Sequence, residues 1–156
     1  GRNPQISWPA GLAGRSGGDE AGSVILVDSS VWIDYFRGDL TPQTDCLDQL
    51  LSSDVLLIGD LVLAEVLQGF ISEHDFNQAK PLLTALPVVP LVGPAIALQA
   101  ARNFRELRAL GVTVWKTIDT LIATSCIENG YTLLYSDRDF APFVEHLGLL
   151  SALPEH

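Results

Sequence analysis

Residues 117–140 constrain the fold most, because they encode a helix, a tight stop and a buried strand in immediate succession. Thr117 is suited to cap the helix, and Gly130 is suited to end it, since glycine readily adopts the left-handed conformation found just past a helix C-terminus. The run 131–135 then predicts a short buried strand, and Ser-Asp-Arg-Asp follows it directly at 136–139. The stretch therefore places one acid at a helix start and another just past the next strand.

Asp119 lies in the first turn of this predicted helix. At 100° per residue, one side of the helix carries an apolar stripe made of Ile118, Leu121, Ile122 and Cys126. Asp119 falls on the inner edge of that stripe, and the predicted solvent face lies opposite, near Thr120 and Thr124. Asp119 therefore either belongs to a buried site or only complements the helix dipole, an effect worth roughly 0.3–1 kcal/mol.

A second acid follows the apolar run 24–27. This run predicts a buried strand that delivers Asp28 at its carboxyl end, and the serines at 29 and 30 are suited to begin a helix. A third acid, Glu65, is the only polar side chain between Leu61 and Leu67 of a helix predicted to start at Asp60. A helix that is apolar nearly all round is buried, so Glu65 needs a partner there. Helical projection also allows Glu65 an ordinary place on the solvent side.

Predicted strands alternate with predicted helices along the whole chain. The strands are expected at 24–27, 55–58, 88–91, 131–135 and 149–150, with the proline-flanked 88–91 at a sheet edge. No two predicted strands are joined directly by an Asn-Gly or Asp-Gly hairpin turn, since the Asn-Gly pair at 129–130 ends a predicted helix. This order predicts an α/β fold, a three-layer α/β/α sandwich with a central, mostly parallel sheet. Ligands of such folds bind at the carboxyl ends of the strands, where Asp28 and Asp137 are expected.

Other helices are expected in the second half of the chain. The segment 74–86 is predicted to be helical with an interruption near Pro81, and a last amphipathic helix contains Phe140 and Phe143. A long helix is expected at 94–110. Its predicted core positions are Ile96, Ala97, Ala101, Phe104 and Leu107.

The 156 residues fit one domain with a proper core. Residues 1–22 are rich in Gly, Ser and Pro and are interpreted as a tail, linker or cloning remnant, which leaves 23–156 as the domain. The sequence lacks an apolar run of ~20 residues and a signal-peptide pattern, so no membrane association is expected. Two distant cysteines, Cys46 and Cys126, give neither a disulfide framework nor a zinc pattern, and a cytoplasmic location is expected.

The net charge of −10 disfavours sequence-independent binding of phosphate backbones. A nucleic-acid partner would require local positive charge or intervening cations. Arg102, Arg105 and Arg108 follow a three-residue spacing and form either a basic strip or an ordinary solvated face. The acidic balance is otherwise explained if several carboxylates gather around a metal ion.

Four converging carboxylates would repel one another, by roughly 4 kcal/mol for each pair 4 Å apart at an effective dielectric constant near 20. A divalent cation relieves that repulsion, and ligands that are all oxygen atoms suit Mg²⁺ or Mn²⁺. Zinc would call for His or Cys, and the three histidines have no spacing typical of ligands. A Mg²⁺ held by carboxylates favours phosphate as its remaining partner, which fits hydrolysis of a phosphodiester.

Four segments, in this order and spacing, resemble the PIN-domain family and in particular the VapC-type toxins of toxin–antitoxin pairs. They read V-I-L-V-D-S-S-V-W-I-D, L-V-L-A-E-V-L-Q-G, T-I-D-T-L-I-A-T-S-C-I-E-N-G and L-L-Y-S-D-R-D-F, and they span most of residues 24–150. The resemblance implies an endoribonuclease that uses Mg²⁺ or Mn²⁺ to activate water and so blocks translation or growth. Its acidic quartet, both catalytic and metal-binding, would be Asp28, Glu65, Asp119 and Asp137.

The resemblance also implies supporting residues and partners. Asp139 is similar to a second acid that family members often carry, and Ser30 resembles a hydroxyl residue that supports the first acid. A VapB-type antitoxin, a homodimer and an RNA substrate are the implied partners. The best candidates for contact with the RNA backbone are Arg102, Arg105, Arg108 and Lys116.

Two alternatives belong to other functional classes. In the first, the chain is a PIN-fold binding partner with a silent nuclease site. In the second, it is a phosphoacceptor receiver domain that uses Asp60, with Lys116 as a phosphate contact. Receivers carry a pair of acids after the first strand, whereas Asp28 is followed by serines.

Overall fold

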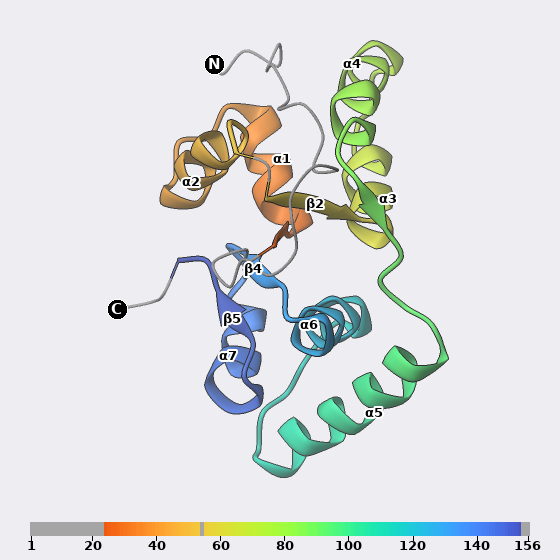
Figure 1. Cartoon of the computed structure of the whole chain (residues 1–156), viewed down its shortest axis with the longest axis vertical. Coiled ribbons are helices and arrows are strands. Elements are labelled where there is room, and N and C mark those ends of the chain that lie inside the picture. Colours follow the sequence, from red (N-terminus) through yellow and green to blue (C-terminus); the bar gives the residue numbers. More distant parts are fainter. Residues whose placement is uncertain (1–23, 54, 154–156) are drawn as a thin grey trace.

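The computed structural model describes residues 24–53 and 55–153, and its centre is a five-stranded sheet (Figure 1). All strand pairs are parallel, and the strand order is β3-β2-β1-β4-β5. The strands are β1 (Ile25–Val27), β2 (Leu56–Gly59), β3 (Val88–Val89), β4 (Thr132–Leu134) and β5 (Leu150–Ser151). The parallel sheet and the edge position of β3 confirm the prediction. The predicted tail, residues 1–22, lies outside the described residues.

The helices form two packed groups, one on each side of the sheet (Figure 1). The first group consists of α1 (Ser29–Arg37), α2 (Pro42–Leu50), α3 (Asp60–Gln68) and α4 (Glu73–Thr84). The second consists of α5 (Pro94–Ala109), α6 (Thr117–Asn129) and α7 (Ala141–Leu147), with the short 3₁₀ helix η1 (Arg138–Phe140) before α7. The predicted three-layer α/β/α architecture is therefore confirmed. None of the helices among the described residues has the length and apolarity needed to cross a bilayer.

The strand order reverses at the centre of the sheet. The chain builds β1, β2 and β3 toward one edge and then returns to build β4 and β5 toward the other. β1 and β4 are therefore neighbours, with Val27 opposite Leu134, and the Asp28 backbone N–H donates to the Leu134 carbonyl at 2.9 Å. In open parallel sheets the point of reversal leaves a crevice at the carboxyl ends of the strands, where ligands bind.

Helix α6 is buried on two sides, contrary to the amphipathic prediction. Thr120 and Thr124, on the expected solvent face, are both buried. The cause is α5, which packs over that face, and whose Asn103 Nδ2 donates to Thr124 Oγ1 at 2.9 Å in a buried hydrogen bond. The α6 helix therefore lies between α5 and the rest of the domain, and its first turn is held from both sides.

Several local predictions differ from the structure. Lys116, not Thr117, is the N-cap residue of α6, and it makes no side-chain cap bond. Ala97 and Ala101 of α5 are exposed, because the buried side of that helix is turned toward Ala100, Asn103 and Leu107. Pro81 lies inside α4 without interrupting it, close to the C-terminal end of the helix.

Candidate active site

Asp28 follows β1 and is the N-cap residue of α1. Its side chain is 3% exposed, and its Oδ2 accepts hydrogen bonds from the Ser30 hydroxyl at 2.7 Å and from the Ser30 backbone N–H at 3.3 Å. Burial raises the pKa of Asp28, and the Ser30 bonds partly oppose this shift. The acid and its predicted supporting serine are therefore in contact at the carboxyl end of the central strand.

Asp119 lies in the first turn of α6 and is 5% exposed. Its Oδ2 atom is buried and has no hydrogen-bond partner among the residues that the structure describes. Burial, and after it the negative charge of Asp28, raise the pKa of Asp119 to about 7. An unsatisfied, buried carboxylate oxygen normally costs free energy, so this position calls for a cation or a proton.

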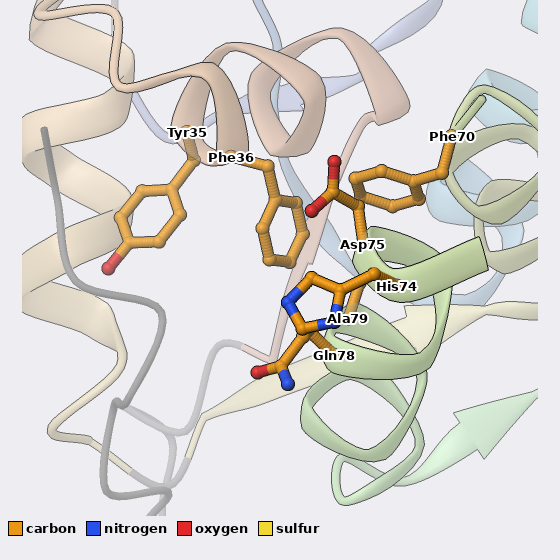
Figure 2. A pocket seen from close by; sticks show the side chains of 7 residues that line it. All are labelled: Tyr35, Phe36, Phe70, His74, Asp75, Gln78 and Ala79. Atoms are coloured by element: carbon orange, nitrogen blue, oxygen red, sulfur yellow. The ribbon is translucent and has the colours of Figure 1, made fainter. Parts of the chain in front are cut away.

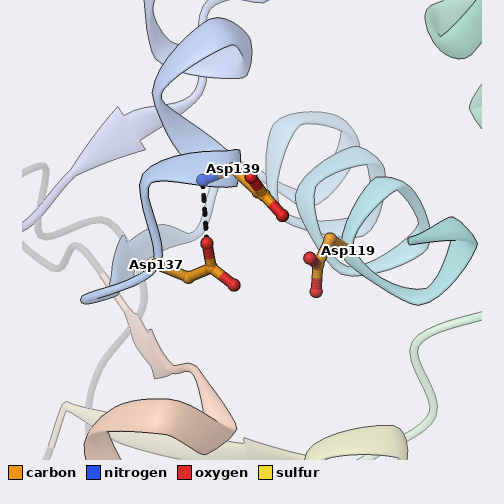
Figure 3. A group of neighbouring side chains, drawn as sticks. All are labelled: Asp119, Asp137 and Asp139. Carbon is orange, nitrogen blue, oxygen red and sulfur yellow. Dashed lines mark hydrogen bonds between the residues drawn. The ribbon is translucent and has the colours of Figure 1, made fainter. Parts of the chain in front are cut away.

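Asp137 and Asp139 meet Asp119 across the loop that follows β4 (Figure 3). One carboxylate oxygen from each of the three side chains lies within 4.8 Å of the other two. Asp137 is the N-cap residue of η1, and its Oδ1 accepts from the Asp139 backbone N–H at 2.9 Å. Asp119 thus belongs to the helix that precedes β4 in the chain, and Asp137 belongs to the loop that follows β4.

Glu65 lies in α3 and is half-buried, and its buried Oε1 has no hydrogen-bond partner within residues 24–53 and 55–153. Burial and then the charge of Asp28 raise the pKa of Glu65, while Ser29 and Lys116 act in the opposite direction. Glu65 and Asp28 are not members of the close group of three. Their charges nevertheless act on the same site, because Asp28 influences both Glu65 and Asp119.

The residues at this site fit a hard divalent cation. Three carboxylates are close enough to share one ion, and two buried carboxylate oxygens, on Asp119 and Glu65, lack partners. All donors are oxygen atoms, which suit Mg²⁺ or Mn²⁺ better than zinc. Asp139 belongs to the close group, although the sequence indicated only an assisting role for it.

Lys116 is a positive group in contact with the acidic site. Its Nζ lies 3.6 Å from Asp137 Oδ2, and its side chain is largely exposed. The negative charge of Asp119, followed by that of Asp137, raises the pKa of Lys116. An ammonium group at the edge of the acidic site is a flexible point charge that can reach a neighbouring anion.

The predicted basic strip on α5 divides in the structure. Arg105 and Arg108 line a mostly apolar hollow of about 540 Å³ between α5 and α6, which reaches Thr117 and Thr120. Arg108 also lies over the Phe104 ring, 5.7 Å from its centroid. Arg102 is exposed on the same helix but does not line the hollow. Two arginines thus border the segment next to Lys116.

Sequence reasoning missed one buried group close to the acids, Ser136, and correctly placed another, Cys126, on the apolar side of its helix. The Ser136 hydroxyl, directly before Asp137, is buried without a hydrogen-bond partner. The Cys126 thiol is also buried, and burial followed by the charge of Asp28 raises its pKa to about 12, which makes it an unreactive packing group. The Ser-Asp pair after the fourth strand was the available signal for Ser136.

A separate hollow of about 320 Å³ lies over α1 and α4, away from the acids (Figure 2). Tyr35 and Phe36 of α1 form one wall, and His74 of α4 contributes to the other. The Phe36 and Phe70 rings meet edge to face with centroids 5.6 Å apart. A second hollow beside it also contains Phe36 and Phe70, and it adds the fully exposed Ile71.

The fold and the site together define a class of protein, a parallel α/β sandwich with an acidic crevice at the reversal of its strand order. The chain belongs to the PIN-domain family, whose family model matches residues 25–143. Its curated relatives are of the VapC type. The VapC ribonuclease Mb1587 of Mycobacterium bovis and ribonuclease VapC11 of Mycobacterium tuberculosis are each 31% identical over 120 residues, covering 75% of this chain and 89% of the relative.

Solved structures share the fold at low sequence identity. VapBC2 from Rickettsia felis, bound to a DNA fragment from its promoter, matches with a TM-score of 0.66 at 17% identity, over 82% of this chain and 96% of that chain. FitAcB from Neisseria gonorrhoeae matches with a TM-score of 0.62 at 16% identity, also over 82% and 96%.

Proposed function

We propose that this protein is an endoribonuclease that depends on Mg²⁺ or Mn²⁺ and acts as the toxin of a toxin–antitoxin pair. The observation that carries the proposal is the group formed by Asp119, Asp137 and Asp139, whose oxygen atoms lie within 4.8 Å of one another. The unpartnered oxygens of Asp119 and Glu65 support it, as do curated relatives named as VapC ribonucleases. The reaction is hydrolysis of an RNA phosphodiester.

The proposed roles follow from the position and charge of each side chain. Asp119, Asp137 and Asp139 would hold the cation, with Asp28 and Glu65 completing the negative site. A bound cation supplies charge neutralisation at a phosphoryl oxygen and lowers the pKa of water. Ser30 fixes the Asp28 carboxylate through its 2.7 Å hydrogen bond, and Lys116 is placed to contact a phosphate. One of the acids with a raised pKa assists proton transfer.

The direct test is cleavage of RNA by the purified protein. We expect cleavage to require added Mg²⁺ or Mn²⁺, to stop with a chelator, and to give 5′-phosphate and 3′-hydroxyl ends. The Asp119→Asn variant should fold and fail to cleave, because it removes charge while keeping shape. Cleavage by that variant at the wild-type rate would contradict the proposed site.

The substrate RNA can be found in cells. We suggest mapping RNA 5′ ends after induction of the wild-type protein and, side by side, of Asp28→Ala. New ends that appear only with the wild-type protein would define the target and its cut site. Identical end profiles for both proteins would contradict the proposal, since no cleavage would then depend on the acidic site.

The proposal includes a VapB-type antitoxin as partner. Solved structures of the same fold include toxin–antitoxin complexes, and the hollow over α1 and α4, which the Phe36 and Phe70 rings help to line, offers a place for a partner segment. Replacing Phe36 with Ala should weaken capture of the antitoxin encoded beside the toxin gene and leave RNA cleavage unchanged. The proposal also includes a homodimer, which light scattering of the purified protein tests.

Two other functions have less support. A silent PIN-fold binding partner would bind no Mn²⁺ in an acid-dependent way, and calorimetry separates it from an enzyme. A phosphoacceptor role for Asp60 is disfavoured because its Oδ1 already accepts from the backbone N–H groups of Leu61 at 2.8 Å and Leu91 at 3.1 Å. Through its hydrogen bond from Leu91, this carboxylate connects the segment after β3 to the start of α3.

A further inference from the structure

Thr120 is a buried polar residue at the hollow between α5 and α6. It is 2% exposed and lines the hollow, and its Oγ1 has no hydrogen-bond partner within residues 24–53 and 55–153. Thr124 lies one turn later on the same face of α6 and accepts from Asn103 of α5 at 2.9 Å, so this face is turned toward α5. An unsatisfied buried hydroxyl costs free energy, which a ligand with a hydrogen-bonding group in the hollow would recover.

Small side chains leave space for such a ligand. The hollow has a volume of about 540 Å³, and its apolar walls come from Ala97, Ala100, Ala101, Phe104 and Leu121. This volume lies in the range of roughly 300–1,000 Å³ that is typical of small-molecule sites, which are mainly apolar and have a few polar groups. The α5 helix lies at the edge of the molecule beside α6 (Figure 1), so this hollow is separate from the one over α1 and α4.

Two arginines make the rim of the hollow positive, although the net charge of the chain is −10. Arg105 and Arg108 are exposed and line the hollow, and their three-residue spacing makes them neighbours on the surface of α5. Neither guanidinium forms an ion pair with a carboxylate in the described part of the chain. None of the described residues that line the hollow is acidic. The rim therefore favours an anionic group, and guanidinium groups bind carboxylates through paired hydrogen bonds.

We propose that the hollow between α5 and α6 binds a free organic acid with an apolar body and a single carboxylate. The carboxylate would accept hydrogen bonds from Arg105, Arg108 and the Thr120 hydroxyl, and the apolar body would cover the alanine wall. The negative net charge disfavours an anionic membrane surface as the source of the acid. The mostly apolar walls disfavour the hydrated phosphate backbone of a nucleic acid. This inference goes beyond the proposed ribonuclease function and does not depend on it.

The test is a titration of the ¹⁵N-labelled full-length protein with octanoate, followed by two-dimensional NMR. Acetate carries the same head group without the chain, and 1-octanol carries the same chain without the charge. We expect octanoate to bind saturably and each control to bind about 5-fold or more weakly, because each lacks one of the two kinds of contact. The amide signals of Ala101, Arg105 and Thr120 should shift most. The signals of Phe36 and Phe70, at the other hollow, report unspecific binding to an apolar surface.

Matched variants test each polar part of the site. Arg105→Gln/Arg108→Gln should bind octanoate about 5- to 25-fold more weakly, because two charged hydrogen bonds at exposed positions are lost. Arg102→Gln/Lys80→Gln removes the same charge outside the hollow and should bind within about twofold of the wild type. Thr120→Val should bind about 2- to 10-fold more weakly, as for one lost hydrogen bond. Without octanoate, Thr120→Val should unfold at the wild-type temperature or above, because an unsatisfied hydroxyl is removed.

The variant Ala101→Phe fills the hollow from an exposed position, so it should fold and should not bind octanoate. Wild-type affinity in Ala101→Phe, in Thr120→Val or in Arg105→Gln/Arg108→Gln would overturn the assignment. Equal weakening by the two double variants would also overturn it, since it would show only a general attraction of anions to positive charge.

Three further results would contradict the proposal. The first is the absence of saturable octanoate binding by the wild-type protein, and the second is a set of NMR shifts confined to Phe36, Phe70 and their neighbours. The third is a changed molecular mass of Ala101→Phe in light scattering while the wild-type protein binds no octanoate. That result would assign the hollow to a contact between two copies of the chain.

Discussion

Two helices of this protein begin with a buried acid on the same edge of the sheet, and the two acids are held in opposite ways. Asp28, at the start of α1, accepts two hydrogen bonds from Ser30 and caps its helix. Asp119, in the first turn of α6, has a buried Oδ2 without a hydrogen-bond partner in the described part of the chain. Lys116, the N-cap residue of α6, makes no side-chain cap bond to this helix either.

The difference separates folding from function at this site. The Asp28 carboxylate stabilises the fold locally through its cap bonds, since N-cap residues are worth about 1 kcal/mol. Asp119 is charged at the expense of stability, because burial and the charge of Asp28 both disfavour its ionised form. The presence of an acid that destabilises the fold at this position is explained if its carboxylate binds the cation.

We expect the two acids to be equally important for RNA cleavage. Asp28→Asn and Asp119→Asn should each lower kcat/KM for RNA cleavage by about 100-fold or more, since several kcal/mol of charge stabilisation are lost. Asp60→Asn is the matched control, an acid at a helix start outside the close group, and it should retain activity within about twofold. Steady-state assays with Mn²⁺ measure these rates. Full activity of Asp119→Asn would contradict a role for Asp119 in cleavage.

In stability, Asp119→Asn should strengthen the metal-free fold. The folded-state pKa of Asp119 is raised from 3.8 to about 7, so its ionised form destabilises the protein as pH rises through that range. At pH 8 the variant should gain on the order of 2–4 kcal/mol in free energy of unfolding, and the gain should vanish near pH 4. Urea unfolding with a chelator present measures this. A loss of stability at pH 8 would contradict the description of Asp119.

Cation affinity should depend on pH through the same group. Since Asp119 has a pKa of about 7 and must lose its proton to bind a cation, Mn²⁺ affinity should rise about tenfold per pH unit below 7 and level off above it. Asp28→Asn should move the midpoint to lower pH, because the charge of Asp28 contributes to the raised pKa of Asp119. Calorimetric titration between pH 5 and 8 tests both, and affinity that does not vary with pH would exclude Asp119 as a ligand.

The smallest effect concerns the rank order of alanine and asparagine at the two positions. Asp28→Ala should be less stable than Asp28→Asn by about 1 kcal/mol, because asparagine keeps the N-cap acceptor. At residue 119 no cap bond exists, and alanine has the higher helix propensity, so Asp119→Ala should equal or exceed Asp119→Asn in stability. Thermal unfolding of the four variants measures the order. The same order at both positions would show that Asp119 also caps its helix.

Much of this arrangement was predictable from local sequence. The run before Asp28 and the strand before Asp137 place both acids at the carboxyl ends of neighbouring strands, and chain order alone predicted the parallel sheet. The exact grouping was not predictable. Distances of a few ångströms depend on the loop after β4, where the Asp139 N–H bond to Asp137 brings Asp139 into the close group.

The surroundings of α6 show why a single helix pattern falls short. Its periodicity indicated a solvent face at Thr120 and Thr124, but α5 covers that face and joins it through Asn103. The same packing turns Ala97 of α5 to solvent, although its spacing suggested a core position. Helical periodicity identifies the apolar side of a helix. It cannot reveal a second helix that packs against its polar side, as α5 does here.

The most direct measurement is a crystal structure of the protein soaked in Mn²⁺, with data collected to reveal the anomalous signal of the metal. We expect a manganese peak in contact with the carboxylates of Asp119 and Asp137, and loss of that peak in Asp119→Asn. A well-occupied manganese elsewhere, or none at all at millimolar concentration and pH 8, would contradict it.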